Sequence, residues 1–284
     1  MNFLRFLLIF AIAVFGGVGN AKAQSTTTVA YRPDLGEASP LLDIYSFDGA
    51  ANAPVVIFVH GGTWQTGQRQ QGPNKIGLFN DAGFIYVSID YRLVPEVRIE
   101  DELVDVEYAV KWVSDHIAQY GGNGQNIHLF GHSAGAHLVT MLAIAPRSVA
   151  RSLVRSGVVR SVYASDLHTY DFLSFAQSVG AHMPPAYSRA IGTDLARIAT
   201  LSPLQNISPA RRIPDFLISF SAQRNSAELR RSSAYAFAEA LRAAGGRAEV
   251  FDGSRYNHKT IIRAVGTQPD ISDAVIGFFQ AHAE

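Results

Sequence analysis

Apolar residues along this chain follow two patterns, short continuous runs and a longer stretch with helical spacing. The runs at 54–60, 84–91 and 127–131 are rich in Val, Ile and Phe, which predicts central strands buried on both faces. Residues 99–120 place apolar side chains at alternating spacings of four and three, which predicts a helix with one apolar stripe. The stripe consists of Ile99, Leu103, Val106, Val110, Val113 and Ile117.

Strand-like and helix-like segments alternate along the rest of the chain. Further strands are predicted at 28–32, 41–47, 158–164, 215–221 and 248–251, and further helices at 73–81, 136–145, 232–244 and 272–282. This alternation predicts an α/β fold with a mostly parallel, doubly wound sheet of about eight strands, whose ligands bind at the carboxyl ends of the strands. Residues 166–212 break the rhythm with Met183-Pro184-Pro185 and two Ser-Pro pairs, which predicts a small helical, cap-like insertion over that edge.

The first 23 residues have the pattern of a secretory signal peptide. Arg5 precedes an apolar run over 6–18, and Ala21-Lys22-Ala23 is a small-x-small cleavage site. The run is shorter than the roughly 20 residues that a spanning helix needs. We therefore expect no stable membrane anchor after signal removal, and a mature protein, 24–284, that forms a single domain in the periplasm or outside the cell. With no cysteine, that domain depends on core packing rather than disulfides.

Charge and motif content exclude several classes of function. The chain carries 24 basic and 24 acidic residues, and loss of Arg5 and Lys22 with the signal leaves a formal charge of −2. No basic stripe indicates nucleic acid. No His/Asp/Glu set has metal-ligand spacing and no glycine-rich loop resembles a phosphate cradle, so we expect neither a metal nor another cofactor. A small molecule is the expected partner, and the sequence does not indicate an oligomeric state.

The stretch Ile127–His137 contains the pattern Gly-x-Ser-x-Gly between a predicted strand and a predicted helix. A strand that turns sharply into a helix brings the backbone at Gly131 and Gly135 close to its neighbours, so side chains there are excluded. This turn presents the Ser133 hydroxyl at a helix N-terminus, where backbone N–H groups favour negative charge. Ser133 is therefore the predicted nucleophile.

A second glycine motif, His60-Gly61-Gly62-Thr63-Trp64, follows the 54–60 strand. Tetrahedral acyl intermediates need backbone N–H donors directed at the oxyanion. We predict that the loop Gly61, Gly62 and Thr63, together with the N–H of Ala134 after the nucleophile, forms this oxyanion hole. Trp64 is expected to line the substrate pocket or to pack the loop, and His60 to orient the loop.

A serine nucleophile needs a base, and in this type of sheet the order along the chain is serine, acid, histidine. His258 follows the last predicted strand by a short loop, at the edge of the sheet where Ser133 is expected. We predict that His258 is the base.

These motifs together resemble the α/β-hydrolase esterases of the hormone-sensitive-lipase type, and most closely the kynurenine formamidase (arylformamidase) and small carboxylesterase branch. The resemblance rests on three stretches and covers nearly all of 24–284. They are His60 to Gln65, Gly131 to Leu138 and Asn257-His258, supported by the segment 90–96. The resemblance implies the α/β-hydrolase fold and hydrolysis of a small ester or amide.

The branch carries its acid after the seventh strand, in a pattern like Asp-Ser-Pro-Glu-Phe. The matching stretch here begins at Asn225, so the resemblance places an amide at the acid position. An amide holds the imidazole tautomer but does not stabilise the imidazolium by charge, and this change lowers turnover about 10⁴-fold in a serine protease. Glu228 and Asp252 are alternative acids. Asp166, which closes the preceding strand, is expected to be structural.

The sequence therefore predicts a secreted serine hydrolase that cleaves small carboxylic esters. Two alternatives stay open at this point. One is hydrolysis of an aryl formamide, and the other is a catalytically weakened binding protein on the same scaffold, for which Asn225 is the reason.

Overall fold

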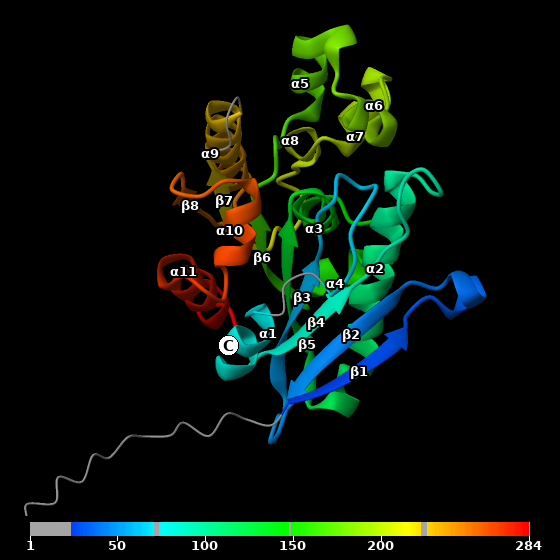
Figure 1. The fold of residues 1–284 in the computed structure, drawn as a ribbon, viewed down its shortest axis with the longest axis vertical. Helices are drawn as coiled ribbons and strands as arrows, with labels where there is room; N and C mark the ends of the chain where they lie inside the picture. Colours follow the sequence, from blue (N-terminus) through cyan, green and yellow to red (C-terminus); the bar gives the residue numbers. More distant parts are fainter. Residues whose placement is uncertain (1–23, 71–73, 148, 223–225, 284) are drawn as a thin grey trace, which may run out of the picture.

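In the computed structural model, the strands join into one eight-stranded sheet with the order β1-β2-β4-β3-β5-β6-β7-β8. The structure describes residues 24–70, 74–147, 149–222 and 226–283, so the expected signal peptide, 1–23, lies outside the described residues. The sheet is parallel from β4 to β8, while β2 is antiparallel to both of its neighbours. The doubly wound, mostly parallel α/β sheet predicted from the sequence is confirmed (Figure 1). The strands are β1 (Gln24–Ala30), β2 (Leu41–Phe47), β3 (Ala53–Val59), β4 (Ile85–Ile89), β5 (Gly122–His132), β6 (Val159–Ser165), β7 (Asp215–Ser221) and β8 (Ala248–Gly253).

Helices follow most strands and cover both faces of the sheet. The main helices are α1 (Asn74–Asp81), α2 (Ile99–His116), α3 (Ala134–Ile144), α4 (Arg151–Ser156), α9 (Ala227–Ala243), α10 (His258–Ala264) and α11 (Pro269–Gln280). Short 3-10 helices lie at Pro33–Ala38, Ile117–Tyr120 and Gly180–His182. The predicted helix over 99–120 is thus α2 continued by one 3-10 turn, and α4 and α10 were not predicted.

Alternate residues of strand β3 face two separate hydrophobic clusters. Val55, Ile57 and Val59 belong to a cluster that also contains side chains of α2, α3 and α9, whereas Val56 and Phe58 belong to one with side chains of α1, α10 and α11. All five side chains are at most 1% exposed. This two-sided burial explains why the strand reads as a continuous apolar run rather than an alternating one.

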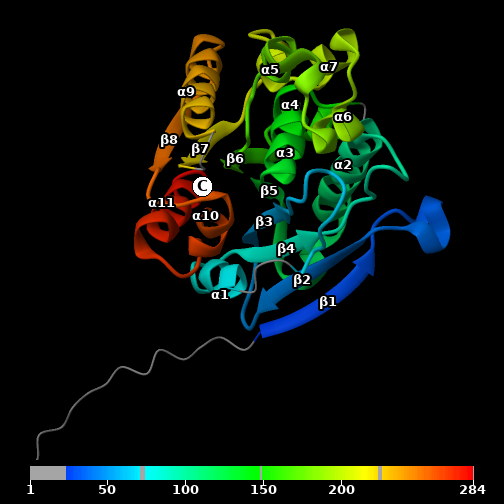
Figure 2. The same ribbon diagram turned by 45° about the horizontal axis from the view of Figure 1, so that its top comes forward.

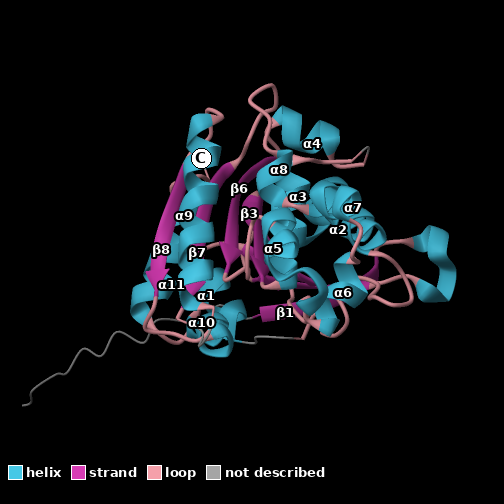
Figure 3. Cartoon of the chain, turned by 90° about the horizontal axis from the view of Figure 1, so that it is seen from above, coloured by secondary structure: helices cyan, strands magenta, loops and turns pink. Residues whose placement is uncertain are grey.

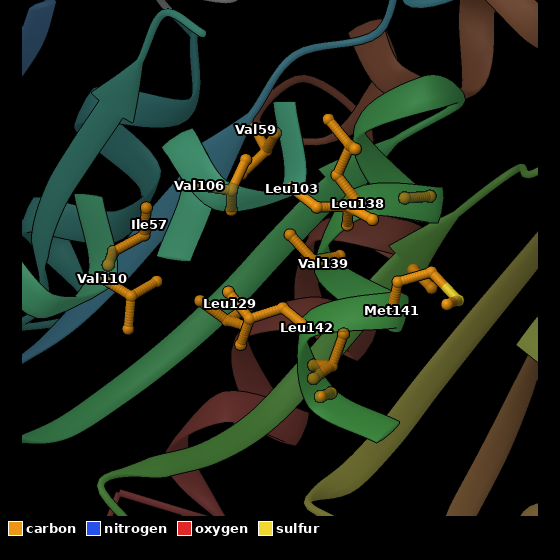
Figure 4. Packing of buried hydrophobic residues seen from close by; sticks show 14 of the residues in the cluster. Ile57, Val59, Leu103, Val106, Val110, Leu129, Leu138, Val139, Met141 and Leu142 are labelled. Atoms are coloured by element: carbon orange, nitrogen blue, oxygen red, sulfur yellow. The ribbon is translucent and has the colours of Figure 1, made fainter. Parts of the chain in front are cut away.

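The apolar stripe of α2 packs against the first of these clusters. Figure 4 shows Leu103, Val106 and Val110 of α2 beside Ile57 and Val59 of β3, with α3 on the other side. All of these side chains are buried. The packing fixes α3, and therefore the turn that precedes it, against the middle of the sheet.

Between β6 and β7 the chain forms α5 (Phe172–Val179), α6 (Pro185–Ile191), α7 (Leu195–Leu201) and α8 (Pro203–Asn206). These four helices, called the cap below, lie within the segment 166–212 where an insertion was expected. Figures 2 and 3 show α5 to α7 on the side of α2 and α3, away from α1 and α10. An ion pair of Arg197 with Glu100, at 2.8 Å, joins α7 to α2. Among the described residues, no helix is long and apolar enough to cross a membrane.

Glu102 on α2 places an ionisable carboxyl in this core, and its protonation state affects the stability of the fold. Its side chain is fully buried, Oε1 accepts a hydrogen bond from the Val94 N–H at 3.2 Å, and Oε2 has no partner among the described residues. Burial raises the pKa of Glu102 to about 9. The unfolded chain releases this proton near pH 4 and the folded chain near pH 9, so the ionisable carboxyl lowers stability as pH rises between these values.

We expect Glu102→Gln to raise the free energy of unfolding at pH 7.5 and to leave it unchanged near pH 4. The upper bound at pH 7.5 is about 4 kcal/mol, since this pH lies about three units above the ordinary glutamate pKa and each unit corresponds to about 1.4 kcal/mol. Denaturant titrations at the two pH values measure the difference, and exposed Glu239→Gln on α9 is the matched control. An equal gain at both pH values would contradict the assigned protonation state.

Candidate active site

The turn between β5 and α3 holds Ser133 in a strained backbone conformation. Its φ of 54° and ψ of −118° lie outside the regions that side-chain-bearing residues favour, at a cost of about 1–3 kcal/mol. The Ser133 N–H donates to the Ser165 carbonyl at 2.9 Å, which ties the turn to the end of β6. The hydroxyl-bearing side chain thus stands at the N-cap of α3, as the motif predicts.

The two motif glycines are required by close backbone contacts. A Cβ at Gly131 would lie 2.3 Å from the Gly135 carbonyl oxygen, and a Cβ at Gly135 would lie 2.0 Å from the Val59 carbonyl oxygen. Both distances are far inside van der Waals contact. The sequence interpretation of these glycines as steric necessities therefore agrees with the backbone geometry.

His258, chosen from the sequence as the base, lies beside Ser133. It is the first residue of α10, and the side chain of Asn257 caps this helix by accepting from the Lys259 and Thr260 N–H groups. The His258 Nε2 lies 3.0 Å from Ser133 Oγ, so the hydroxyl donates to the imidazole. Helix α10 thus fixes the imidazole at hydrogen-bonding distance from the hydroxyl.

The other ring nitrogen of His258 donates to the carboxylate of Asp166, for which the sequence predicts a structural role. His258 Nδ1 lies 2.6 Å from Asp166 Oδ2. The prediction that Asp166 is only structural is therefore wrong. Asn225 lies outside the described residues. Of the two alternative acids, Asp252 accepts from the Ser254 N–H at 2.9 Å, and the side chain of Glu228 is 82% exposed beside Arg231.

Strand register explains why Asp166 reaches the imidazole. His132 and Ser165 are paired residues at the ends of the parallel strands β5 and β6, so Ser133 and Asp166 each follow their strand at the same level. Asp166 has a φ of 54°, and its N–H donates to the Ser219 carbonyl on β7. The serine and the carboxylate are thus placed side by side by neighbouring strands.

The Asp166 carboxylate is fully buried and surrounded by donors. Oδ1 accepts from the Ser221 N–H at 2.8 Å, Oδ2 accepts from Ser221 Oγ at 2.6 Å, and Arg230 forms an ion pair with Oδ1 at 3.2 Å. Burial alone raises the pKa of Asp166, but the His258 hydrogen bond, the Arg230 charge and Ser221 lower it to about 2. The carboxylate is therefore ionised at neutral pH, with the charge that an imidazolium needs beside it.

The loop after β3 approaches Ser133 closely. A Cβ at Gly61 would lie 2.9 Å from the His132 carbonyl oxygen and 3.0 Å from Ser133 Cβ, and Gly62 and Thr63 have φ values of 135° and 56°. Among the described residues, no acceptor takes a hydrogen bond from the N–H groups of Gly62, Thr63 or Ala134. These N–H groups are free to bind an oxyanion.

Two aromatic contacts hold this loop in place. His60 stacks on Tyr91 with ring centroids 4.4 Å apart, and its Nδ1 donates to the Gly61 carbonyl at 2.8 Å. Trp64 is only 1% exposed, and its indole N–H donates to His137 Nδ1 at 3.3 Å. The Trp64 ring also packs edge-on against Tyr187 of the cap, so it packs the loop and lines a cavity at once.

Two cavities meet at Ser133 and share Thr63, Ser133 and His258. The first, of about 550 Å³, lies between the loop after β3, α1 and α10. The second, of about 310 Å³, lies toward the cap and includes Leu167, His168 and Tyr187 in its lining. A bound molecule centred on Ser133 can therefore extend to either side of the hydroxyl.

His132 completes the surroundings of the imidazole. Its ring stacks on His258 with centroids 4.8 Å apart, and Nε2 donates to the His258 carbonyl at 3.1 Å. Burial lowers the pKa of His132 to about 3, so the ring is neutral. His132, Asp166 and His258 place metal-ligating atoms within 4.8 Å of one another. In this arrangement, however, His258 Nδ1 and Asp166 Oδ2 are occupied by their mutual hydrogen bond.

Comparison with solved structures shows the fold. The Thermogutta terrifontis esterase with propionate bound has a TM-score of 0.70 to this chain, covers 91% of it and 96% of its own chain, and is 22% identical. The chain has the α/β-hydrolase fold. Esterase B from Lactobacillus rhamnosis gives the same TM-score, 0.70, at 20% identity, with 90% of this chain and 87% of that chain covered.

Sequence comparisons support the resemblance read from the motifs. Residues 42–163 match the family model described as BD-FAE. This matched segment includes the loop after β3 and Ser133 but ends before Asp166 and His258. Esterase LipQ of Mycobacterium tuberculosis is 38% identical over 126 residues, or 43% of this chain and 30% of LipQ. Kynurenine formamidase of Drosophila melanogaster is 29% identical over 115 residues, or 40% of this chain and 38% of that protein. The α/β-hydrolase chain thus aligns with well under half the length of these relatives. The predicted resemblance to esterases and to kynurenine formamidase is confirmed.

Proposed function

We propose that this α/β-hydrolase is a serine hydrolase that cleaves small carboxylic esters, with Ser133, His258 and Asp166 as its catalytic triad. The observation that carries the proposal is the continuous hydrogen-bond chain from the Ser133 hydroxyl through His258 to the Asp166 carboxylate. Relatives named esterase and carboxylic ester hydrolase support it.

The geometry supports a two-step acyl transfer. Ser133 Oγ attacks the ester carbonyl while His258 Nε2 takes its proton, and the ionised Asp166 stabilises the imidazolium that forms. The N–H groups of Gly62, Thr63 and Ala134 receive the negative charge of the tetrahedral intermediate. The imidazolium then protonates the departing alcohol, and a water molecule activated by His258 releases the acid and restores Ser133.

Covalent labelling tests the proposal. A fluorophosphonate probe is expected to label the wild-type protein stoichiometrically, because His258 as general base activates Ser133, which lines both cavities. Mass spectrometry of peptides locates the label. Modification of Ser133 in native protein, and none in protein unfolded by denaturant, is the expected result. An unlabelled Ser133 would instead favour a non-catalytic binding protein on this scaffold.

An aryl formamide is the second candidate substrate. The observation that favours it is the similarity to the Drosophila kynurenine formamidase. Comparing kcat/KM for a short-chain phenyl ester with that for a formanilide, each divided by the rate constant of its uncatalysed hydrolysis, separates the two. An ester hydrolase is expected to accelerate the ester more, and a formamidase the formanilide.

We also propose export of the mature protein, on the signal-like pattern of residues 1–23. Fractionation of cells that express the full chain tests this proposal. Recovery in the periplasm or medium, with an N-terminus near Gln24, is expected; recovery of full-length protein in the cytosol would contradict it.

A further inference from the structure

The larger cavity beside Ser133 carries positive charge without a balancing carboxylate. Three of its lining residues are cationic, Lys75 of α1 and Lys259 and Arg263 of α10. Among the described residues that line it, none is aspartate or glutamate. A cavity with charge of one sign and apolar walls, here Phe58 and Ile262, attracts a ligand group of the opposite sign.

Lys75 is the most informative of the three. Its side chain is only 2% exposed, yet it makes no ion pair and no hydrogen bond within the part of the chain that the structure describes. Its ammonium lies 5.2 Å from the centroid of the Phe58 ring. Lys75 also stands in the first turn of α1, where the helix dipole disfavours a cation.

This placement is unfavourable for a charged lysine that has no anionic partner among the described residues. Burial lowers the pKa of Lys75 to about 8, and no carboxylate contributes to the shift. Buried charges are usually paired. An anionic ligand group would supply the missing partner and restore the charged form of the ammonium.

The other two cations extend the positive charge to the opening of the cavity. Lys259 and Arg263 are exposed, and they lie four residues apart on α10, hence on one face of that helix. Neither forms an ion pair among the described residues. Burial is the main cause of the lowered pKa of His132, and the Lys75 charge lowers it further; His132 immediately precedes Ser133.

We infer that the preferred substrate carries a carboxylate on the half of the ester that occupies this cavity, where Lys75 binds it and Lys259 and Arg263 attract it at the mouth. The inference rests on the proposed ester hydrolysis and narrows its substrate class. A charge-assisted hydrogen bond from the buried ammonium to the carboxylate is the specific contact.

Paired esters that differ only in charge test this inference. On the acyl side, mono-4-nitrophenyl adipate is compared with the nitrophenyl ester of adipamic acid; on the alcohol side, 4-carboxyphenyl butyrate is compared with 4-carbamoylphenyl butyrate. The measured quantity is the ratio of kcat/KM for carboxylate over carboxamide. This ratio is independent of the fraction of active enzyme, so partial unfolding of a variant does not affect it.

In the wild type, the ratio is expected to reach about 10 or more in one arm, which also identifies the ester half that fills the cavity. Lys75→Met is expected to bring that ratio close to 1. Lys111→Met is the matched control, because Lys111 is exposed on α2 and paired with Asp115, and it should keep the wild-type ratio. Ratios near 1 in both arms, or an unchanged ratio in Lys75→Met, would overturn the inference while leaving ester hydrolysis intact.

A binding measurement separates this inference from the proposed function. Ser133→Ala protein and the double variant Ser133→Ala/Lys75→Met are each titrated calorimetrically with the carboxylate ester and with the matching carboxamide ester. Tighter binding of the carboxylate than of the carboxamide, lost in the double variant, supports the anion site even if no ester is hydrolysed. Equal affinity for the two would contradict the anion site.

Discussion

Ser133→Ala is expected to lower kcat for a short-chain nitrophenyl ester by about 10⁶-fold, the scale seen when a triad nucleophile is removed from another serine hydrolase. The alanine leaves the oxyanion N–H groups and both cavities in place but removes the hydroxyl oxygen that forms the acyl-enzyme in the proposed mechanism. Steady-state kinetics on purified protein measure the loss. Circular dichroism and the unfolding midpoint verify that the α/β core is retained.

A double variant makes this prediction sharper. Residues that act as one unit are not additive, so Ser133→Ala/His258→Ala should be no slower than either single variant. Wild-type and Ser133→Ala enzymes with equal rates would end the assignment of a serine hydrolase. Losses that multiply in the double variant would show that Ser133 and His258 act independently, against the 3.0 Å contact between them.

Asp166→Asn is expected to lower kcat by about 10⁴-fold, as the equivalent substitution does in a serine protease. The amide keeps the hydrogen-bonding shape but loses the charge that stabilises the imidazolium. Stability should also fall at neutral pH, because the pKa of about 2 means that ionised Asp166 stabilises the fold above about pH 4 and loses this effect as pH falls toward 2. Activity is therefore expressed per folded molecule, from active-site titration.

Two comparison variants decide which acid serves His258. Asp252→Asn removes an exposed carboxylate that already accepts from Ser254, and it is expected to change kcat by less than about twofold, as surface substitutions usually have small effects. Asn225→Asp in the Asp166→Asn background should not restore activity. A rescue there, or a large loss in Asp252→Asn, would move the third position away from Asp166.

Much of the architecture follows from local pattern. The β-branched run of β3 and the four-and-three spacing of α2 each match one physical requirement, burial on two faces or along one stripe. The serine turn is equally local, because a Cβ on Gly131 or Gly135 would lie within about 3 Å of neighbouring backbone atoms. His258 could be chosen because it follows the last strand at the edge where ligands bind.

The acid and the buried lysine could not be found in this way. Asp166 meets His258 because β5 and β6 end in register, and that pairing is a long-range property of the sheet. The motif resemblance pointed instead to the segment after β7, which led to Asn225. Lys75 looks like an ordinary helix residue in the sequence, and only the packing of α1 against Phe58 shows that its charge is enclosed.

The two cavities on either side of Ser133 have a consequence for the order in which the alcohol leaves and water enters. In the proposed mechanism, an ester held across the Ser133 hydroxyl places its acid part in one cavity and its alcohol part in the other, and the alcohol is released first. The cavity that the alcohol leaves would then give the hydrolytic water a route to the acyl-enzyme, while the acyl chain stays in the other cavity. Nucleophiles small enough to enter that cavity, such as methanol, should therefore compete with water for the acyl-enzyme and form a new ester.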